Sequence, residues 1–154
     1  MSRASTRAEK PGINVRNFQR KVRVDILALQ RFSEQALMSC LHYRRGSDTQ
    51  LRRLSQVSIV LISDRRMCDL HRRFLDKSDP TDVITFDHGE IFISLETARK
   101  HARRFRTSVL HEVQLYIVHG LLHLHGFDHR GEADARAMDE LQKKILERIA
   151  NAQR

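Results

Sequence analysis

Apolar residues recur at spacings of three and four in several parts of the chain, which is the period of one buried face of an α-helix. The series Leu29, Phe32, Ala36 and Cys40 predicts an amphipathic helix that ends near Gly46. The same period predicts four more helices: one entered through Ser63 or Asp64 and lined by apolar residues from 67 to 75, and three over residues 95–105, 108–125 and 132–150. The third of these four is apolar nearly all round, so we expect it to run through the centre of the domain.

Short apolar runs of strand length lie between the predicted helices. The run at residues 57–62 is almost continuously apolar, which is typical of a strand buried on both faces. Residues 82–86 and 90–94 predict two strands joined by a turn, and a further strand is predicted over residues 13–18. Strands and helices in this order indicate an α+β fold, with a small mixed β-sheet packed by helices.

Length and composition indicate a single globular domain. The chain has 154 residues, of which 40% are hydrophobic and 31% charged, as in ordinary soluble proteins. Residues 1–12 carry basic and small polar residues without an apolar run, so we expect a disordered basic arm, followed by one domain over residues 13–154. Cys40 and Cys68 are too few for a disulfide framework and are expected to be reduced core residues. No run approaches the roughly 20 apolar residues of a membrane span, and we expect a cytoplasmic protein.

The charge balance favours a polyanionic partner. Lysine and arginine together number 28 against 19 acidic residues, which gives a formal net charge of +9 at pH 7. Such a field attracts polyphosphates to the surface and favours nucleic acid over an anionic membrane as the partner. Basic residues are densest in residues 99–106 and in four arginine pairs, at 44–45, 52–53, 65–66 and 72–73.

Three histidines are spaced as the ligands of one metal ion. His119 and His123 are four residues apart, so on a helix they lie about 40° apart on one face. Gly126 follows, where a glycine can end the helix in the left-handed conformation and let the chain bring His129 back to the same point. Three imidazoles leave a fourth coordination position to water, which is the ligand set of a catalytic zinc. The alternative is a buried histidine cluster held by hydrogen bonds.

Neighbouring residues decide which reaction a zinc ion would serve. The spacing is that of the long metalloprotease motif, but Gly120 stands where a peptidase carries its general-base glutamate. This absence, with the net positive charge, favours a phosphodiester over a peptide as the substrate. Asp128 is expected to orient a ligand imidazole, to act as a base or to cap the following turn. His125 points about 200° away from the ligand face and His111 is expected at the helix surface, so neither is expected to be a ligand.

The stretch from His119 to His129 resembles the signature of the YbeY endoribonucleases, a family of ribosomal RNA maturation factors. That signature reads His-Gly-x-Leu-His-Leu-x-Gly-Tyr-Asp-His, and this chain departs from it only by Phe127 in place of the tyrosine. The segment at 80–86, Pro-Thr-Asp-Val-Ile-Thr-Phe, is similar to the family's Pro-Thr-Asp-Val-Leu-Ser-Phe. The order of elements agrees from about residue 14 to about residue 150.

This resemblance implies an activity, a cofactor and partners. It implies a zinc-dependent, single-strand-specific endoribonuclease that acts in maturation of the 16S rRNA 3′ end and in ribosome quality control. One Zn²⁺ ion per chain would be held by His119, His123 and His129, and it would activate the attacking water. Precursor ribosomal RNA and the small ribosomal subunit are the implied partners. The resemblance also supports the α+β fold, with a central metal-binding helix.

One position of the family pattern differs in a way that bears on catalysis. Leu75 stands where the family has an arginine that is expected to contact phosphate near the metal, whereas Lys77 retains the family's lysine. Arg73, or Arg72 beside it, is the expected substitute, so Arg73 and Lys77 are predicted to engage phosphates. The loop after Phe86 is also shorter than is usual in the family. These departures leave open a ribosome-assembly factor that binds RNA or ribosomal protein, with a mainly structural metal and little cleavage.

Overall fold

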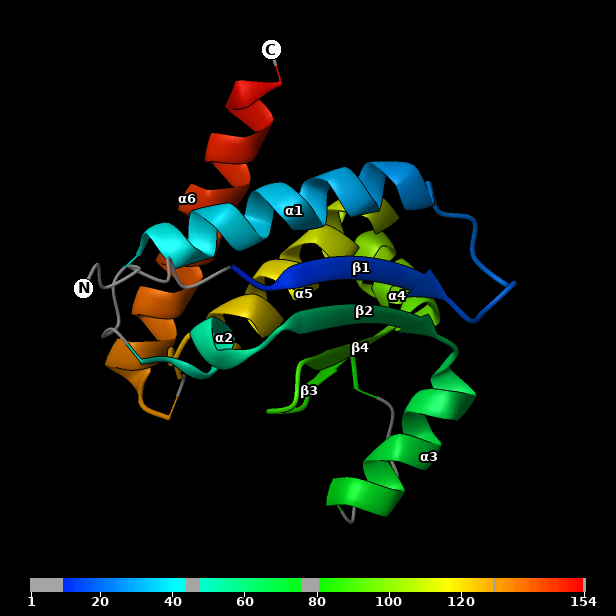
Figure 1. The fold of residues 1–154 in the computed structure, drawn as a ribbon. Coiled ribbons are helices and arrows are strands. Elements are labelled where there is room, and N and C mark those ends of the chain that lie inside the picture. The colour runs from blue at the N-terminus through cyan, green and yellow to red at the C-terminus, as the bar shows by residue number, and fades with distance from the viewer. Residues whose placement is uncertain (1–9, 44–47, 76–80, 129, 154) are drawn as a thin grey trace, which may run out of the picture.

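The computed structural model describes residues 10–43, 48–75, 81–128 and 130–153, and it confirms the α+β architecture. Three strands run parallel and the fourth pairs antiparallel with its neighbour, in the sheet order β1-β2-β4-β3 (Figure 1). The elements are β1 (Gly12–Asn17), α1 (Ile26–His42), α2 (Gln50–Arg53), β2 (Gln56–Ile62), α3 (Asp64–Leu75), β3 (Val83–Thr85), β4 (Glu90–Ser94), α4 (Leu95–Phe105), α5 (Val109–Leu124) and α6 (Glu132–Ala152).

Most of the predicted elements are confirmed, and the differences lie in short or polar segments. The helix α2 was not predicted, because four residues are too few to show a helical period; it begins at Thr49, whose side chain accepts a hydrogen bond from the backbone of Arg52. The strand β1 begins at Gly12, inside the segment expected to be a disordered arm, and Pro11 beside it is buried. Residues 1–9 of that arm lie outside the described residues.

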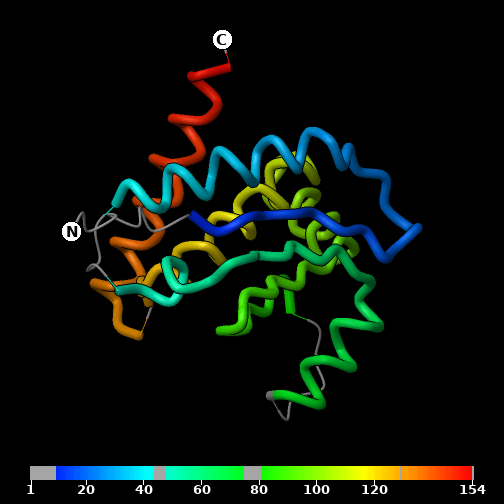
Figure 2. The backbone as a smooth tube through the Cα atoms, viewed as in Figure 1, coloured from blue at the N-terminus to red at the C-terminus, as the bar shows by residue number. Residues whose placement is uncertain are grey.

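Helices cover the two faces of the sheet unequally. The helices α1 and α5 pack on one face, where Leu29 and Leu121 join Ile59 and Ile91 in the main core. On the opposite face α3 contributes to a smaller apolar cluster, made of Val60, Ile62, Met67 and Ile84. Figure 1 and Figure 2 show α1 and α3 on opposite sides of the strands. Strand β2 is therefore buried on both faces, as its sequence predicted.

The edge strand β1 is bound by a side chain of α1. In the sheet order, β1 has a neighbouring strand on one side only. The side-chain oxygen of Gln30 accepts a hydrogen bond from the backbone nitrogen of Val15 at 2.8 Å, and its side-chain nitrogen donates one to the carbonyl oxygen of Ile13 at 2.8 Å. One glutamine thus satisfies two backbone groups of the edge strand, which offsets the absence of a second neighbour.

The helix α5 is buried along most of its length and lies close against the sheet. A Cβ atom added to Gly120 would stand 2.8 Å from Cγ2 of Ile91 and 3.1 Å from Oγ1 of Thr85. The helix ends at Gly126, whose φ of 89° is the left-handed conformation that the sequence predicted. The position of α5 is therefore fixed by a contact with the strands that only glycine permits.

The structure also bears on the expectations about membrane spans and about the two cysteines. No helix among the described residues is long and apolar enough to cross a membrane. Cys40 is free and buried, as expected, and burial raises the pKa of its thiol. Cys68 is also free, but it is partly exposed, because it follows the buried Met67 on α3 and so lies at the border of the buried face.

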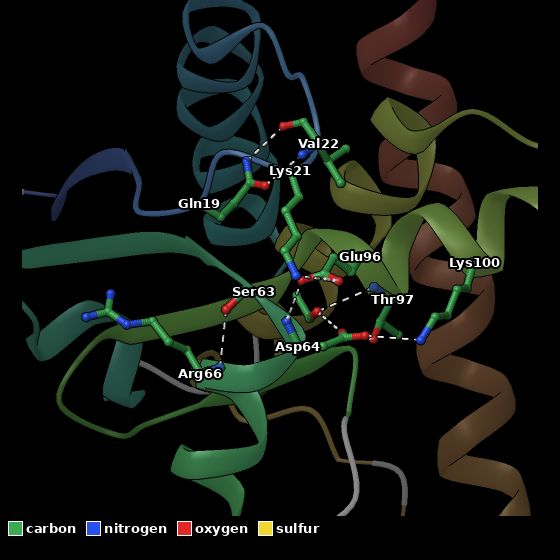
Figure 3. Close-up of polar contacts among 10 residues, drawn as sticks. Gln19, Lys21, Val22, Ser63, Asp64, Arg66, Glu96, Thr97 and Lys100 are labelled. Carbon is green, nitrogen blue, oxygen red and sulfur yellow. Dashed lines mark hydrogen bonds and ion pairs between the residues drawn. The ribbon is translucent and has the colours of Figure 1, made fainter.

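A carboxylate at the start of α3 ties this helix to α4 (Figure 3). Asp64 accepts hydrogen bonds from Oγ of Ser94, from Oγ1 of Thr97 at 2.6 Å and from Nζ of Lys100 at 3.1 Å. Its backbone nitrogen donates to Oε1 of Glu96 at 3.2 Å. Burial alone would raise the pKa of the Asp64 carboxyl, but the three side-chain donors favour the charged form and hold the pKa below its ordinary value.

We expect Gly120→Ala to destabilise the protein, although alanine is the better helix former by about 1 kcal/mol. The added methyl group would overlap Ile91, which is fully buried and cannot move aside without disturbing the core. Overpacking of this kind costs about 1–3 kcal/mol, which urea unfolding measures. In the double variant with Ile91→Ala, the loss should be smaller than the sum of the two single losses. Additive losses, or a more stable Gly120→Ala protein, would contradict the close contact.

We expect Asp64→Asn to lower the stability at pH 7 by about 1–3 kcal/mol, since three donors lose a charged acceptor. Because folding lowers this pKa, the carboxylate adds stability above its unfolded pKa of about 3.9, and that stability is lost as the pH falls through the folded pKa. The difference between wild type and variant, measured by urea unfolding from neutral to acid pH, should therefore shrink at the acid end.

Asp48→Asn is the matched control for this measurement. Asp48 pairs with Arg53, but their side chains are 68% and 61% exposed, so removing the pair should change stability little at any pH. If the loss of unfolding free energy in Asp64→Asn does not vary with pH, the shape of the side chain matters at this position and its charge does not.

Candidate metal centre

A cleft of about 450 Å³ lies between the C-terminal half of α5 and the segment that contains β3. We call it the histidine cleft, because two of the three histidines predicted as metal ligands line it. The residues that line it are His71, Thr81, Asp82, Val83, Ile84, Thr85, Phe86, Asp87, His119, His123 and Leu124. The two motifs singled out in the sequence, about 40 residues apart, therefore meet at one place in the structure.

His119 and His123 lie on the same face of α5, as their spacing predicted. Their ring centroids are 5.5 Å apart and the ring planes are inclined at 83°. Both side chains are half-buried, so they reach the cleft without being sealed in the core. Neutral imidazoles at this spacing are suitable ligands for Zn²⁺, which usually binds about four ligands, mostly through nitrogen or sulfur atoms.

Gln142 of α6 holds the ring of His119 from the side. Its side-chain nitrogen lies 2.9 Å from Nδ1 of His119, and the glutamine is buried. As placed, the amide nitrogen donates to Nδ1; after a half-turn of the amide, its oxygen would instead accept a hydrogen bond from Nδ1–H. In that arrangement Nε2 of His119 keeps its lone pair for a metal, which is the usual way in which a ligand imidazole is fixed.

Other predicted site residues lie partly outside the described chain. His129 and Lys77 are not among the described residues, nor is the side chain of Leu75. Within the part of the chain that the structure describes, no group of three or more His, Cys, Asp or Glu side chains is arranged to hold a metal ion. His119 and His123 therefore share a face beside the cleft, and their role as metal ligands, with His129 as the third, stays a prediction.

Two further candidates have positions that the sequence did not indicate. The carboxylate of Asp128 lies 2.7 Å from Nε of Arg130, whose side chain is 89% exposed, so this ion pair contributes little to stability, and the expected roles of Asp128 stay predictions. Arg73 is exposed and lines a neighbouring groove with Arg66, and it is not among the residues that line the histidine cleft. Its predicted contact with phosphate in that cleft stays a prediction.

The two histidines that were not expected to be ligands lie away from the cleft. His125 is fully buried; Nδ1 lies 2.9 Å from Oγ1 of Thr49 and Nε2 lies 2.5 Å from the carbonyl oxygen of Tyr43. Burial lowers the pKa of His125, which keeps the ring neutral in the core. His111 is exposed in the first turn of α5. The expected positions of the two side chains, with His125 off the face of His119 and His123 and with His111 at the helix surface, are confirmed.

The sequence interpretation missed two residues that belong to this centre. His71 of α3 is buried and lines the cleft; its signal was its place four residues after Met67, on the buried face of the helix. Gln142 was missed as well, although it interrupts an otherwise apolar face of α6. A buried polar residue on an apolar face needs a partner, and here the partner is His119.

The turn after β3 follows the sequence prediction. The backbone nitrogen of Gly89 donates to the carbonyl oxygen of Phe86 at 2.9 Å, and Gly89 has a φ of 107°. A Cβ atom at this glycine would stand 2.6 Å from the carbonyl oxygen of Gln56, so the tight turn depends on glycine for both conformation and space.

Comparisons with known proteins show the family and the fold of this chain. The model of the family described as Endoribonuclease YbeY matches residues 14–150. A protein of Aquifex aeolicus with that name is 31% identical, over 97% of this chain and 99% of the relative. One of Bacteroides thetaiotaomicron is 33% identical, over 62% of this chain and 74% of the relative. A solution structure of a Thermotoga maritima protein has the same fold, with a TM-score of 0.64 at 24% identity over 92% of this chain and 91% of that one. The chain belongs to the YbeY endoribonuclease family.

Proposed function

We propose that this protein is a zinc-dependent endoribonuclease that cuts single-stranded precursor ribosomal RNA. The observation that carries the proposal is the meeting of His119 and His123 with residues 81–87 in one cleft. Membership of a family of endoribonucleases supports the reaction class, and the net charge of +9 supports a polyanionic substrate. Maturation of the 16S rRNA 3′ end, ribosome quality control, the small ribosomal subunit as partner and a cytoplasmic location are part of the same proposal.

Each residue of the cleft has a separate role in this proposal. His119, His123 and His129 would hold one Zn²⁺ ion per chain, and Gln142 would keep His119 in the tautomer that leaves Nε2 available. Bound there, zinc would supply Lewis acidity and lower the pKa of a coordinated water toward 7. Thr85 lines the same cleft, and its hydroxyl would be able to donate a hydrogen bond to a phosphate oxygen.

A peptidase is disfavoured by the packing of α5. A peptidase of this ligand spacing needs a glutamate at position 120. The structure has Gly120 there, and even a Cβ atom would press on Ile91 and Thr85. A glutamate side chain would have to enter the core, so the missing base follows from how closely the helix lies on the sheet.

The alternative function, a ribosome-assembly factor with little cleavage, is favoured by one observation. Among the described residues that line the histidine cleft there is no lysine or arginine. Nucleases that transfer phosphoryl groups commonly use a cation to stabilise the negative charge of the transition state. Here that role would fall to the metal ion alone or to Lys77, and cleavage would be slow if neither supplied enough charge.

We expect the purified protein to cut single-stranded RNA and to spare duplex RNA, with activity lost in a chelator and restored by zinc. His119→Ala and His123→Ala should each lose most of the bound zinc and at least about tenfold in cleavage rate, because a ligand is removed. Elemental analysis and gel assays with labelled RNA measure the two effects. His111→Ala is the control, as an exposed histidine on the same helix. RNA that is bound but not cut would favour the assembly factor, and full zinc in both variants would contradict the metal site.

We expect Gln142→Leu to lower the zinc affinity about 10- to 100-fold, because His119 loses the partner that fixes its tautomer. Gln142→Glu should bind zinc at least as tightly as wild type, since a carboxylate accepts the same hydrogen bond. Competition with a colorimetric chelator measures both affinities. Lys143→Leu, at an exposed neighbouring position of α6, should leave the affinity unchanged. Equal affinities for Gln142→Leu and wild type would mean that Gln142 only fills space.

A further inference from the structure

The face of the sheet that α3 covers carries a second hollow, beside the histidine cleft. The strand register places Arg16 opposite Val60, Val60 opposite Phe92 and Phe92 opposite Ile84, so these four side chains share one face. A groove of about 530 Å³ lies on this face, between the strands and α3. We call it the arginine groove, because Arg16, Arg66 and Arg73 line it.

An exposed aromatic ring in the arginine groove is in contact with two guanidinium groups. Phe18, directly after the end of β1, is 48% exposed, which is unusual for a phenylalanine. The guanidinium carbon of Arg16 lies 4.9 Å from the centroid of its ring, and that of Arg66 lies 5.9 Å away. Both guanidinium groups lie over the ring, so a base that stacks on Phe18 would take the place of one of them, and the displaced cation would be next to the adjacent phosphate.

The charges of the arginines are available to a ligand. Within the residues that the structure describes, none of Arg16, Arg66 and Arg73 forms an ion pair with a carboxylate. Two carboxylates also line the groove, but that of Glu90 lies 2.5 Å from Nε2 of His88 and that of Asp69 is exposed to water. The groove therefore offers three guanidinium groups that have no carboxylate partner among the described residues, and a guanidinium binds phosphate by paired, charge-assisted hydrogen bonds.

A chain of aromatic rings joins the arginine groove to the histidine cleft. Phe92 lines the groove and Phe86 lines the cleft, and their ring centroids are 5.7 Å apart. Phe74 of α3 packs on Phe86 at 5.3 Å and is itself 62% exposed. A strand of RNA that leaves the cleft would thus meet an exposed ring on the way to the three arginines.

We propose that the arginine groove is a second binding site for single-stranded RNA, which holds nucleotides next to those in the histidine cleft. Bases stack on Phe18 and Phe74, and Arg16, Arg66 and Arg73 bind the phosphates between them. Duplex RNA is excluded, because its bases are already stacked on one another. The proposal rests on the proposed function for the identity of the ligand, but binding in the groove is measured without cleavage.

The test is the affinity of the full-length protein for a short 2′-O-methyl oligouridylate, which resists cleavage, at several salt concentrations. Phe18→Ala should weaken binding at least about fivefold, as expected for the loss of one stacked base. Phe18→Leu, which keeps an apolar side chain but no aromatic face, should weaken it nearly as much. Arg66→Ala should lower the slope of log affinity against log salt by about 0.7 for each phosphate contact that is lost.

A matched pair on another surface provides the control. Phe105 is 58% exposed and the guanidinium carbon of Arg104 lies 5.5 Å from its ring centroid, so the pair has the chemistry of Phe18 and its arginines but lies on α4, outside both hollows. Phe105→Ala and Arg104→Ala should leave the affinity and the salt slope unchanged. Equal losses for both pairs would indicate general attraction by the basic surface and would overturn the proposal.

Two further outcomes separate this inference from the proposed function. In the first outcome, Phe18→Ala and Arg66→Ala bind the oligouridylate as tightly as wild type, but Arg66→Ala no longer binds a polyglutamate peptide. This outcome would identify the groove as a protein-binding site and overturn the proposal. In the second outcome, the groove variants lose RNA binding, whereas variants at His119 or His123 cut RNA at the wild-type rate. This outcome would support the groove as a binding site and contradict the proposed nuclease centre. Melting temperatures should stay at the wild-type value in all these variants, since every substituted side chain is exposed.

Discussion

Close contact between α5 and the sheet is the constraint on which the rest of the structure depends. Because residue 120 has no side chain, the backbone of the helix approaches Ile91 of β4 and Thr85 of β3 directly. This approach brings His119 and His123, on either side of the glycine in sequence, to the wall formed by residues 81–87. A larger residue would move the helix away from the strands and widen the cleft. The same glycine therefore determines the shape of the centre and excludes a side-chain base at that position.

Charge is divided between two hollows rather than concentrated in one. The described lining of the histidine cleft carries imidazole, hydroxyl and carboxylate groups, whereas three arginines line the groove on the neighbouring face. A divalent cation and a guanidinium group repel each other when they are close, and this repulsion is strong where water is excluded. Cations placed at a distance still attract a polyanion, without weakening the hold of the imidazoles on a metal ion.

The sequence predicted those parts of the structure that depend on local period. Apolar spacing located α1, α5 and α6, and the continuous apolar run located β2, because burial of a helix face or strand leaves a regular pattern. The four-residue helix α2 has no such pattern and was missed. The histidine spacing also predicted correctly that His119 and His123 share a face and that Gly126 ends the helix, since both are properties of a single helix and its cap.

What the sequence could not indicate are contacts between elements far apart in the chain. Gln142 approaches His119 from another helix, and nothing in the spacing of either residue specifies that meeting. Arg73 was expected to contact phosphate near the metal because it lies within one helical turn of Leu75, which replaces the arginine of the family. A helix turns about 100° per residue, however, so His71 and Arg73 of α3 point in different directions, and they line different hollows.

The bond between Gln30 and the edge of the sheet has a consequence for the protein in a crowded solution. An edge strand with free backbone groups is a template on which a second chain can add a strand, and this is a common first step of aggregation. Gln30 occupies the backbone nitrogen of Val15 and the carbonyl oxygen of Ile13, the groups that such a strand would need. The exposed side chain of Arg16 adds positive charge along the same edge, which repels another copy. A single polar residue of α1 thus hinders the addition of a second chain to the edge of the sheet. It does so without shortening β1 or weakening the parallel pairing of β1 with β2.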